Sequence, residues 1–408
     1  MNKIIRNIFI ILVILVFIVA FSPSYTSLNI DNLAYVIALG IDVGENEKFN
    51  ISFQFTTGSS GSDSGNTEKS PLIVNSVEAS SIDTAINLMN SYLAKKLNLS
   101  HCRLLIFSEE VAAQGIANEI YTLANDSQIR HSANIIVSKN KAKDYMENST
   151  PILENLVTKY YEIFPKSSKY TGYIYNVTFA DFLNQYINNT CEPFAILGGV
   201  NQNSSESNND TKSSTNVDSM KSTNTPFSGD RGAENLGIAV FKDDKLVGEL
   251  TAIETLCLSI IRGDTDSFLI TISDPEDSEK ELDLRLFNQG NKKIKVDIVN
   301  GSPYITFEAK YIARVYSMKD DAKYLDDNIL ELISEEANKY MEEIITKYLY
   351  RTSIEFKSDI SGFGKYGLSN FLTAQEFAEY NWQNTYVNST FKVIIDTNVE
   401  SGFLINET

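Results

Sequence analysis

Histidine and cysteine are scarce in this sequence, and with them the side chains that most often carry catalysis or bind metal ions. The 408 residues include two histidines and three cysteines. The cysteines lie far apart and form no C-x-x-C pair, so their spacing indicates neither a zinc site nor a redox motif. The sequence also lacks a G-x-S-x-G elbow, an H-E-x-x-H pair and a P-loop. We therefore identify no catalytic, cofactor-binding or metal-binding residues, and we expect buried thiols at Cys102, Cys191 and Cys257.

Positive charge is also in deficit. The chain has 35 Lys and Arg against 53 Asp and Glu, which gives a formal net charge of −18. Proteins that bind DNA or RNA neutralise phosphates with clustered cations, and the longest basic runs here are Lys95-Lys96 and Lys292-Lys293. This balance excludes nucleic acid as a partner. It predicts a soluble, acidic surface that anionic lipid headgroups repel.

Long hydrophobic runs are absent except at the N-terminus. From Ile8 to Phe21 the chain carries no charge, and with its uncharged flanks the run approaches the roughly 20 residues that span a bilayer. Lys3 and Arg6 precede it, which favours a cytoplasmic N-terminus and an outer location for the residues that follow. The run predicts a membrane-spanning signal anchor, whose apolar side chains include Ile8, Phe9, Leu12, Leu15, Phe17, Val19 and Phe21.

A cleaved signal peptide is the alternative interpretation of the same run. Cleavage requires a small-x-small site, for which Ala20-Phe21-Ser22 is the best candidate. Pro23 follows this site directly and disfavours cleavage. The sequence therefore favours the uncleaved anchor.

Beyond the anchor, the hydrophobic period switches repeatedly between two residues and three to four. The first pattern predicts strands and the second predicts amphipathic helices. In the first half the predicted strands are 33–42, 49–55, 104–107 and 133–137, and the predicted helices are 82–97 and 109–123. In the second half we predict a hairpin at 237–250, a helix at 251–263 with a Thr251/Glu254 capping box, strands within 282–315, a long helix at 329–348 and a final strand at 391–399. This mixture is typical of the α+β class.

The predicted architecture is a transmembrane anchor followed by a three-domain ectodomain of mixed sheets and helices. One stretch after residue 201 consists almost wholly of Asn, Ser, Thr, Asp and Lys, so it has too little apolar surface to offset the entropy of ordering. The predicted units are a cytoplasmic tip and anchor at 1–27, an N-terminal α/β domain at 28–170, a middle domain at 171–275 with a disordered insert at 201–235, and a C-terminal α+β domain at 276–408.

Local patterns that suggest chemistry have simpler interpretations. His101 and Cys102 are adjacent in a predicted strand, so their side chains point to opposite faces and do not form a nucleophile–base pair. Residues 362–367 spell G-x-G-x-x-G, but a helical segment precedes them, which favours a glycine turn with positive φ over a dinucleotide site. The acidic pairs at 320–321 and 326–327 lack EF-hand spacing, so we expect a solvated turn and a helix N-cap.

Several short segments of the sequence occur in a characteristic order along the chain. Residues 32–42 read NLAYVIALGID, residues 99–107 read LSHCRLLIF and residues 237–248 read GIAVFKDDKLVG. Residues 359–364 read DISGFG and are followed by a tryptophan and a late glycine. In this order the segments resemble the Ger(x)C family, the C subunits of bacterial spore germinant receptors. The family-motif positions, to which we assign structural roles, are Gly40, Asp42, His101, Arg130, Asp359, Gly362, Gly364, Trp382 and Gly402.

The resemblance implies a non-catalytic subunit of a nutrient germinant receptor. Such a subunit belongs to the spore inner membrane, beside two integral-membrane subunits of A and B type, with its ectodomain on the outer face. It is required for the response to germinant and thus for spore germination. The alternatives from other classes are a membrane-tethered cell-envelope hydrolase and a stand-alone solute-binding or adhesion ectodomain.

One departure from the family pattern concerns the anchor. Family members commonly carry a lipobox cysteine just before the first strand. Here no cysteine precedes Cys102. Lipid attachment at that place is therefore excluded, and the hydrophobic run has to hold the protein at the membrane.

Overall fold

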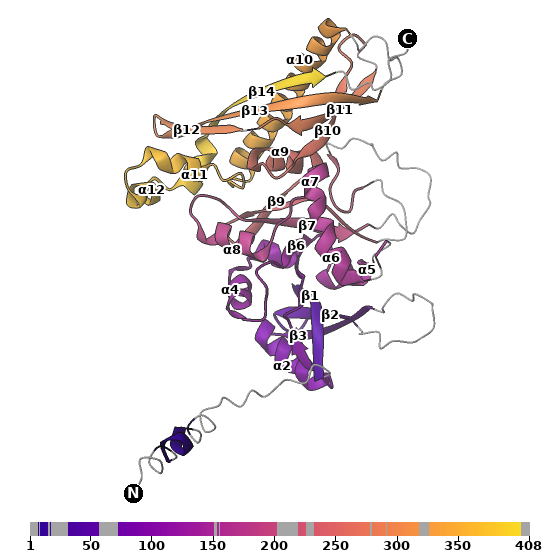
Figure 1. Cartoon of the computed structure of the whole chain (residues 1–408), viewed down its shortest axis with the longest axis vertical. Helices are drawn as coiled ribbons and strands as arrows, with labels where there is room; N and C mark the ends of the chain where they lie inside the picture. The colour runs from indigo at the N-terminus through magenta and orange to yellow at the C-terminus, as the bar shows by residue number, and fades with distance from the viewer. Residues whose placement is uncertain are drawn as a thin grey trace.

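Two β-sheets organise the chain and follow one another along the long axis of the molecule (Figure 1). The first sheet lies toward the N-terminal end and the second toward the C-terminal end, with helix α9 (Ala252–Arg262) between them. The computed structural model describes residues 7, 9–14, 17, 32–56, 72–150, 153–154, 156–201, 219–225, 232–277, 280–290, 292–317 and 326–400.

The first sheet contains nine strands in the order β3-β2-β1-β5-β6-β7-β8-β9, with β4 paired to β1. Its centre, β1-β5-β6-β7, is parallel, and both flanks are antiparallel. The central strands are buried along almost their whole length, as parallel strands covered on both faces require. The strands are β1 Leu33–Val43, β2 Phe49–Thr56, β3 Leu72–Ala79, β4 Lys96–Asn98, β5 Leu104–Ser108, β6 Asn134–Ser138, β7 Phe194–Val200, β8 Ala233–Lys242 and β9 Lys245–Leu250.

The helices of the first half are short and mostly connect these strands. They are α2 Ile82–Tyr92, α3 Glu109–Gln114, α4 Ala117–Asn125, α5 Ala142–Asn148, α6 Val157–Ile163, α7 Ser168–Thr171 and α8 Phe179–Ile187. Two differ from the sequence prediction. The helix predicted at 82–97 ends at Tyr92 because Leu97 pairs in β4 beside β1. The helix predicted at 109–123 is broken at Gly115, where φ is +112°.

The second sheet contains five strands in the order β10-β11-β13-β12, with β14 also paired to β13. All pairs are antiparallel except β13 with β14. Its buried side chains alternate along the strands, which marks a sheet with one face on the core. The strands are β10 Ser267–Ser273, β11 Glu281–Asn288, β12 Lys293–Val299, β13 Ser302–Ser317 and β14 Thr390–Glu400.

Helix α10 (Asp327–Tyr350) packs against this sheet and covers the outer edge of β14. Asp326 is its N-cap, as predicted. The backbone N–H of Thr397 donates to Asn338 Oδ1 at 2.8 Å, and those of Ile395 and Val399 donate to Glu342 and Ser334. A π turn (Arg351–Glu355) extends the helix, and short helices follow it: α11 Gly364–Gly367, α12 Ala374–Tyr380 and α13 Trp382–Thr385.

The predicted α+β class is confirmed by these two sheets and their helices. The two boundaries predicted within the ectodomain, after residues 170 and 275, lie between β6 and β7 of the first sheet and between β10 and β11 of the second. Within the predicted insert at 201–235, residues 202–218 and 226–231 lie outside the described residues. Residues 219–225 differ from the prediction: Ser222 is buried and exchanges backbone and side-chain hydrogen bonds with Leu236.

The predicted anchor lies largely outside the described residues, which include neither Ile8, Leu15, Val19 nor Phe21. Phe9, Leu12 and Phe17 are helical, and their side chains are exposed. In the part of the chain that the structure describes, no helix has both the length and the apolar character needed to cross a bilayer.

Candidate functional site

The carboxylate of Asp359 lies at the centre of the C-terminal motif. It is fully buried and accepts four hydrogen bonds. The backbone N–H groups of Gly362 and Phe363 donate to Oδ1 at 2.9 and 3.2 Å. That of Gly364 and the indole Nε1–H of Trp382 donate to Oδ2 at 2.9 and 2.8 Å. Four of the predicted motif positions therefore meet in one constellation.

Different physical reasons require glycine at different positions of this loop. Gly362 has a φ of +77°, which confirms the predicted glycine turn. A Cβ at Gly364 would lie 2.5 Å from the Thr190 carbonyl oxygen and 2.8 Å from Cδ1 of Trp382. Gly367 is similarly close to the indole ring. The G-x-G-x-x-G pattern thus lets a turn pack around a tryptophan.

The chemistry available to Asp359 is limited by its surroundings. Burial raises the pKa of this carboxyl, and the N–H groups of Gly364, Trp382, Phe363 and Gly362 oppose that rise. Each carboxylate oxygen already accepts two hydrogen bonds, and no part of the side chain reaches solvent. The carboxylate therefore stabilises the loop and has no free position at which to bind a reactant.

Gly40 and Asp42, at the end of β1, hold helix α5. Asp42 accepts hydrogen bonds from the backbone N–H groups of Ala142 and Lys143, at 2.6 and 3.1 Å, and so satisfies the start of the helix. A Cβ at Gly40 would lie 2.6 Å from Cε of Met146 and 3.0 Å from Cβ of Ala142. The pair therefore fixes a helix against the centre of the first sheet.

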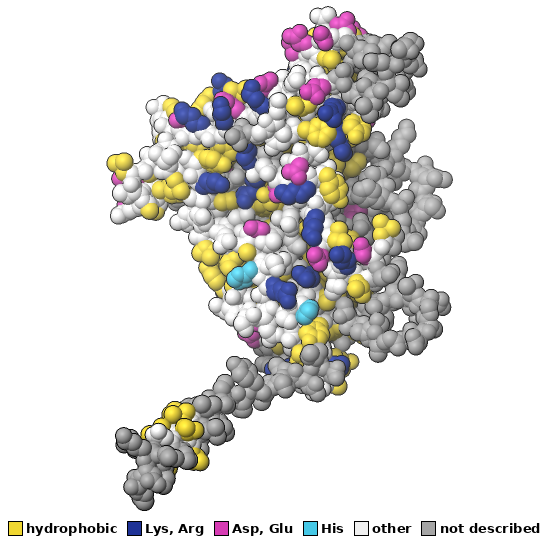
Figure 2. All heavy atoms as spheres, viewed as in Figure 1, with side chains coloured by type: hydrophobic (Ala, Val, Ile, Leu, Met, Phe, Trp, Pro, Cys, Tyr) yellow, Lys and Arg dark blue, Asp and Glu magenta, His cyan; other side chains and the backbone are white. Residues whose placement is uncertain are grey.

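The remaining motif positions are not part of either constellation. His101 and Arg130 are exposed, and the ring of His101 contacts that of Tyr35 at 4.7 Å. Cys102 is buried instead and donates to the Leu104 carbonyl at 3.3 Å. The strand expected to include both residues begins only at Leu104, so the two neighbours differ in burial and do not occupy opposite faces of a strand. Figure 2 shows the histidine side chains as separate cyan patches. Gly402 lies outside the described residues.

The cysteines are poor nucleophiles in this fold. All three are free thiols; Cys102 and Cys257 are buried and Cys191 is partly buried. Burial raises the pKa of Cys102 and of Cys191 to about 12 in each case. A thiol with such a pKa stays protonated at neutral pH. No group of three or more His, Cys, Asp and Glu side chains among the described residues is arranged to hold a metal ion.

A pocket of about 280 Å³ lies beside the Asp359 loop, between α8, the end of α9 and the second sheet. Arg262, the last residue of α9, donates to the Ile360 carbonyl at 2.8 Å and lies 3.6 Å from Sγ of Cys191. Its guanidinium group stacks on Phe194 at 5.0 Å from the ring centroid. The residues of this pocket lie far apart in the chain, between positions 175 and 366, so no local sequence pattern marks them.

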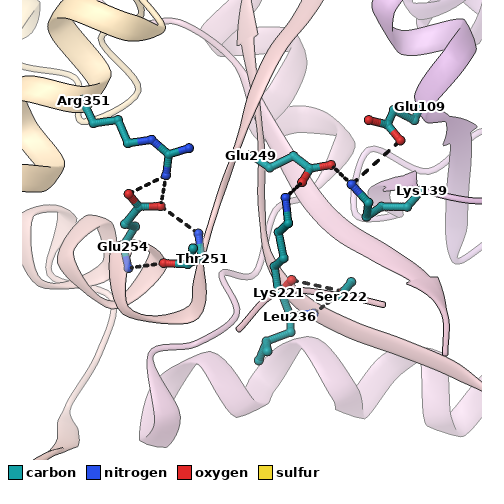
Figure 3. Close-up of polar contacts among 9 residues, drawn as sticks. All are labelled: Glu109, Lys139, Lys221, Ser222, Leu236, Glu249, Thr251, Glu254 and Arg351. Atoms are coloured by element: carbon teal, nitrogen blue, oxygen red, sulfur yellow. Dashed lines mark hydrogen bonds and ion pairs between the residues drawn. The ribbon is translucent and has the colours of Figure 1, made fainter. Parts of the chain in front are cut away.

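Ion pairs connect α9 to the C-terminal segment and β9 to Lys139 and Lys221 (Figure 3). Glu254 forms the predicted capping box with Thr251 and also binds Arg351 of the π turn through both carboxylate oxygens. Glu249 of β9 lies between Lys139 and Lys221. These contacts hold segments that are distant in sequence in one arrangement.

Comparisons with known proteins cover nearly the whole described fold. The family model of the spore germination protein N-terminal domain matches residues 26–197. That of the spore germination B3/GerAC like, C-terminal domain matches residues 236–402. The chain is 19% identical to the putative spore germination protein YfkR of Bacillus subtilis (strain 168) over 93% of each chain. It is 20% identical to the spore germination protein KC of the same strain, over 88% of this chain and 86% of that protein.

A solved structure has the same fold. The crystal structure of the GerBC protein superposes with a TM-score of 0.51, covering 89% of this chain and 96% of that chain at 14% identity. The two family models together span both sheets, the Asp42 cap of α5 and the Asp359 constellation. The chain therefore belongs to the Ger(x)C family of spore germination proteins.

Proposed function

We propose that the chain is a non-catalytic subunit of a nutrient germinant receptor in the spore inner membrane. It acts beside two integral-membrane subunits of A and B type and is required for the response to germinant. Membership of the Ger(x)C family carries this proposal. The names of the relatives, which place YfkR and KC in spore germination, support it.

The state of the polar groups supports a role by contact rather than by chemistry. Asp359 and Asp42 are engaged by backbone N–H groups of the chain itself. The thiols of Cys102 and Cys191 are held protonated by burial. A hydrolase needs a nucleophile or base that reaches its substrate, and these groups do not.

The anchor belongs to the same proposal. The uncharged run from Ile8 to Phe21, preceded by Lys3 and Arg6, tethers the fold to the outer face of the membrane with the N-terminus in the cytoplasm. If this topology is correct, protease added to intact forespore protoplasts should digest the folded ectodomain, because it lies outside the membrane. An ectodomain that stays intact would indicate the opposite topology.

The test of the proposed role is deletion of the gene in the organism that carries it. Spores of the deletion strain should fail to lose optical density in the germinating nutrient, while growth of the vegetative cells is unchanged. The full chain supplied in trans should restore germination, and affinity purification of the tagged chain from detergent-solubilised spores should recover both membrane subunits. Normal germination of the deletion strain in every nutrient, or recovery of the chain alone, contradicts the proposal.

A further inference from the structure

The pocket beside the Asp359 loop gathers three cations in a chain whose net charge is −18. Arg262 comes from the end of α9, Lys292 precedes β12 and Lys365 lies in α11, so three separate segments converge on it. None of the described residues that line the pocket is an Asp or a Glu. Within the described part of the chain, none of the three cations forms an ion pair with a carboxylate.

The charges of these cations are not cancelled by the other groups of the pocket. Burial raises the pKa of Cys191 to about 12 and also raises the pKa of Tyr175, so both stay neutral near pH 7. Asp359 does not line the pocket, and its two oxygens are engaged by four N–H donors of the loop and of Trp382. Figure 2 likewise shows Lys and Arg side chains well represented on the face in view, although the protein as a whole is acidic.

The environment of Lys292 combines burial with two neighbouring cations. Its ammonium group donates to the Ile261 carbonyl at the end of α9. Burial, followed by the charges of Lys365 and Arg262, lowers its pKa from 10.5 to about 8. Like charges held this close are costly unless an anion joins them.

The rest of the wall can bind the oxygen atoms of a ligand. Asn184, Gln185 and Asn188 of the α8 region line the pocket together with Thr190. Gln185 is 8% exposed, and its Oε1 has no hydrogen-bond partner among the described residues. A buried acceptor left in this way is typical of a place where the O–H of water or of a ligand supplies the missing donor. The guanidinium of Arg262 is held in position by the Ile360 carbonyl and by Phe194, so it is preorganised.

We propose that this pocket is a binding site for a small polyanion that carries two or more carboxylate or phosphate groups. Arg262, Lys292 and Lys365 hold the negative charges, and the amide NH₂ groups of the α8 region donate to the remaining oxygens. The pocket volume of about 280 Å³ is near the lower end for small-molecule sites, which suits a compact metabolite. The absence of a lining carboxylate among the described residues disfavours a free ammonium group on the ligand. This inference is independent of the proposed receptor role.

Calorimetric titration of the detergent-solubilised full chain tests the site. Citrate and inorganic phosphate are the probes, at a constant ionic strength set with chloride, and the zwitterion L-alanine is the comparison. We expect saturable binding of citrate, phosphate or both, and none of alanine. The relative affinity of citrate and phosphate distinguishes a carboxylate ligand from a phosphate ligand. Failure of both anions to saturate the wild-type chain overturns the proposal.

Three variants separate the site from general charge effects. Lys365→Gln removes an exposed ammonium whose described contact is with the ring of Tyr366, so the fold should survive. Lys292→Gln and Lys365→Gln should each weaken binding by about tenfold, the loss expected for one charge-assisted contact. Lys293→Gln changes the same charge at the next residue, which is exposed and does not line the pocket, and it should leave binding unchanged. Equal weakening by all three variants, or by none, overturns the proposal.

Discussion

The indole Nε1–H of Trp382 donates a hydrogen bond of 2.8 Å to Oδ2 of Asp359, and both side chains are buried. Trp382 is the single tryptophan of the chain. The bond joins the start of α13 to the loop that follows the π turn, and Gly364 donates to the same oxygen at 2.9 Å. This contact makes tryptophan fluorescence a direct reporter of the constellation.

Replacing Asp359 by Asn should destabilise the fold by about 2–4 kcal/mol. The amide NH₂ cannot accept a hydrogen bond, so two buried N–H donors lose their acceptor, each at a cost of about 1–3 kcal/mol. Urea unfolding of the detergent-solubilised chain, followed by Trp382 fluorescence, measures the loss. Asp266→Asn, at an exposed carboxylate, should change the free energy of unfolding by less than about 0.5 kcal/mol. Similar values for the two variants would contradict the structural role of Asp359.

Gly364→Ala should cost more than Gly301→Ala, although only Gly301 has a positive φ, of +81°. A Cβ at Gly364 meets the Thr190 carbonyl at 2.5 Å, whereas a Cβ at Gly301 has no atom within 4 Å. We expect a loss of about 1 kcal/mol from backbone strain at Gly301. At Gly364 we expect more than about 2 kcal/mol from overpacking. The same urea titration compares them, and the reverse order would disprove the close approach.

Glu254 and Arg351 should be energetically coupled. Their side chains are 16% and 32% exposed, and the bond is bidentate on the carboxylate side. A double-mutant cycle with Glu254→Gln and Arg351→Met should give a coupling free energy of about 1–2 kcal/mol. The control pair, Lys310 and Asp396, is 69% and 61% exposed and should show no measurable coupling. Equal coupling in both cycles would mean that the partial burial of Glu254 has no effect.

Stability should rise with pH through the titration of Lys292. In the folded chain its pKa is about 8, whereas the ordinary value is 10.5. Between these values the unfolded chain binds more protons, so the free energy of unfolding increases with pH. Lys292 is partly buried, and we expect the wild type to gain about 1–2 kcal/mol relative to Lys292→Gln between pH 7 and pH 10. A constant difference between the two chains would show that Lys292 titrates normally.

Cys191→Ser should leave germination unchanged. The thiol is held protonated with a pKa of about 12, and its hydrogen donates to the Glu192 carbonyl at 3.3 Å, a bond that a serine hydroxyl can replace. Spores that carry the variant should lose optical density in nutrient at the wild-type rate. A germination defect in a variant of normal thermal stability would contradict an inert thiol.

Local sequence signals predicted most of the elements because they depend on near neighbours. Asp243 and Asp244 form the turn between β8 and β9, and Asp243 adopts a φ of +54°. Thr251 and Glu254 form the capping box of α9. Leu97 has helical spacing from the apolar residues before it, but it pairs with β1 instead, and its N–H donates to Asn90 Oδ1. Tertiary contacts of this kind cannot be predicted from the hydrophobic period of the sequence.

The candidate sites were predicted unequally for the same reason. Asp359, Gly362 and Gly364 lie within six residues, so their pattern can be recognised in the sequence. Arg262 and Lys292 carry no such pattern; they meet in the folded chain, where the Lys292 ammonium donates to the carbonyl of Ile261, the residue before Arg262. The sequence indicates an acidic chain, whereas the structure shows that three of its cations converge on one pocket.

The contact between α10 and β14 limits how this protein can join another. The N–H groups of Ile395, Thr397 and Val399 face away from β13 and already donate to side chains of the helix. A strand from a second chain that approached this edge of β14 would find these N–H donors already occupied. Extension of the second sheet by a partner therefore has to start at β10 or β12, on the opposite side of the ladder from β14.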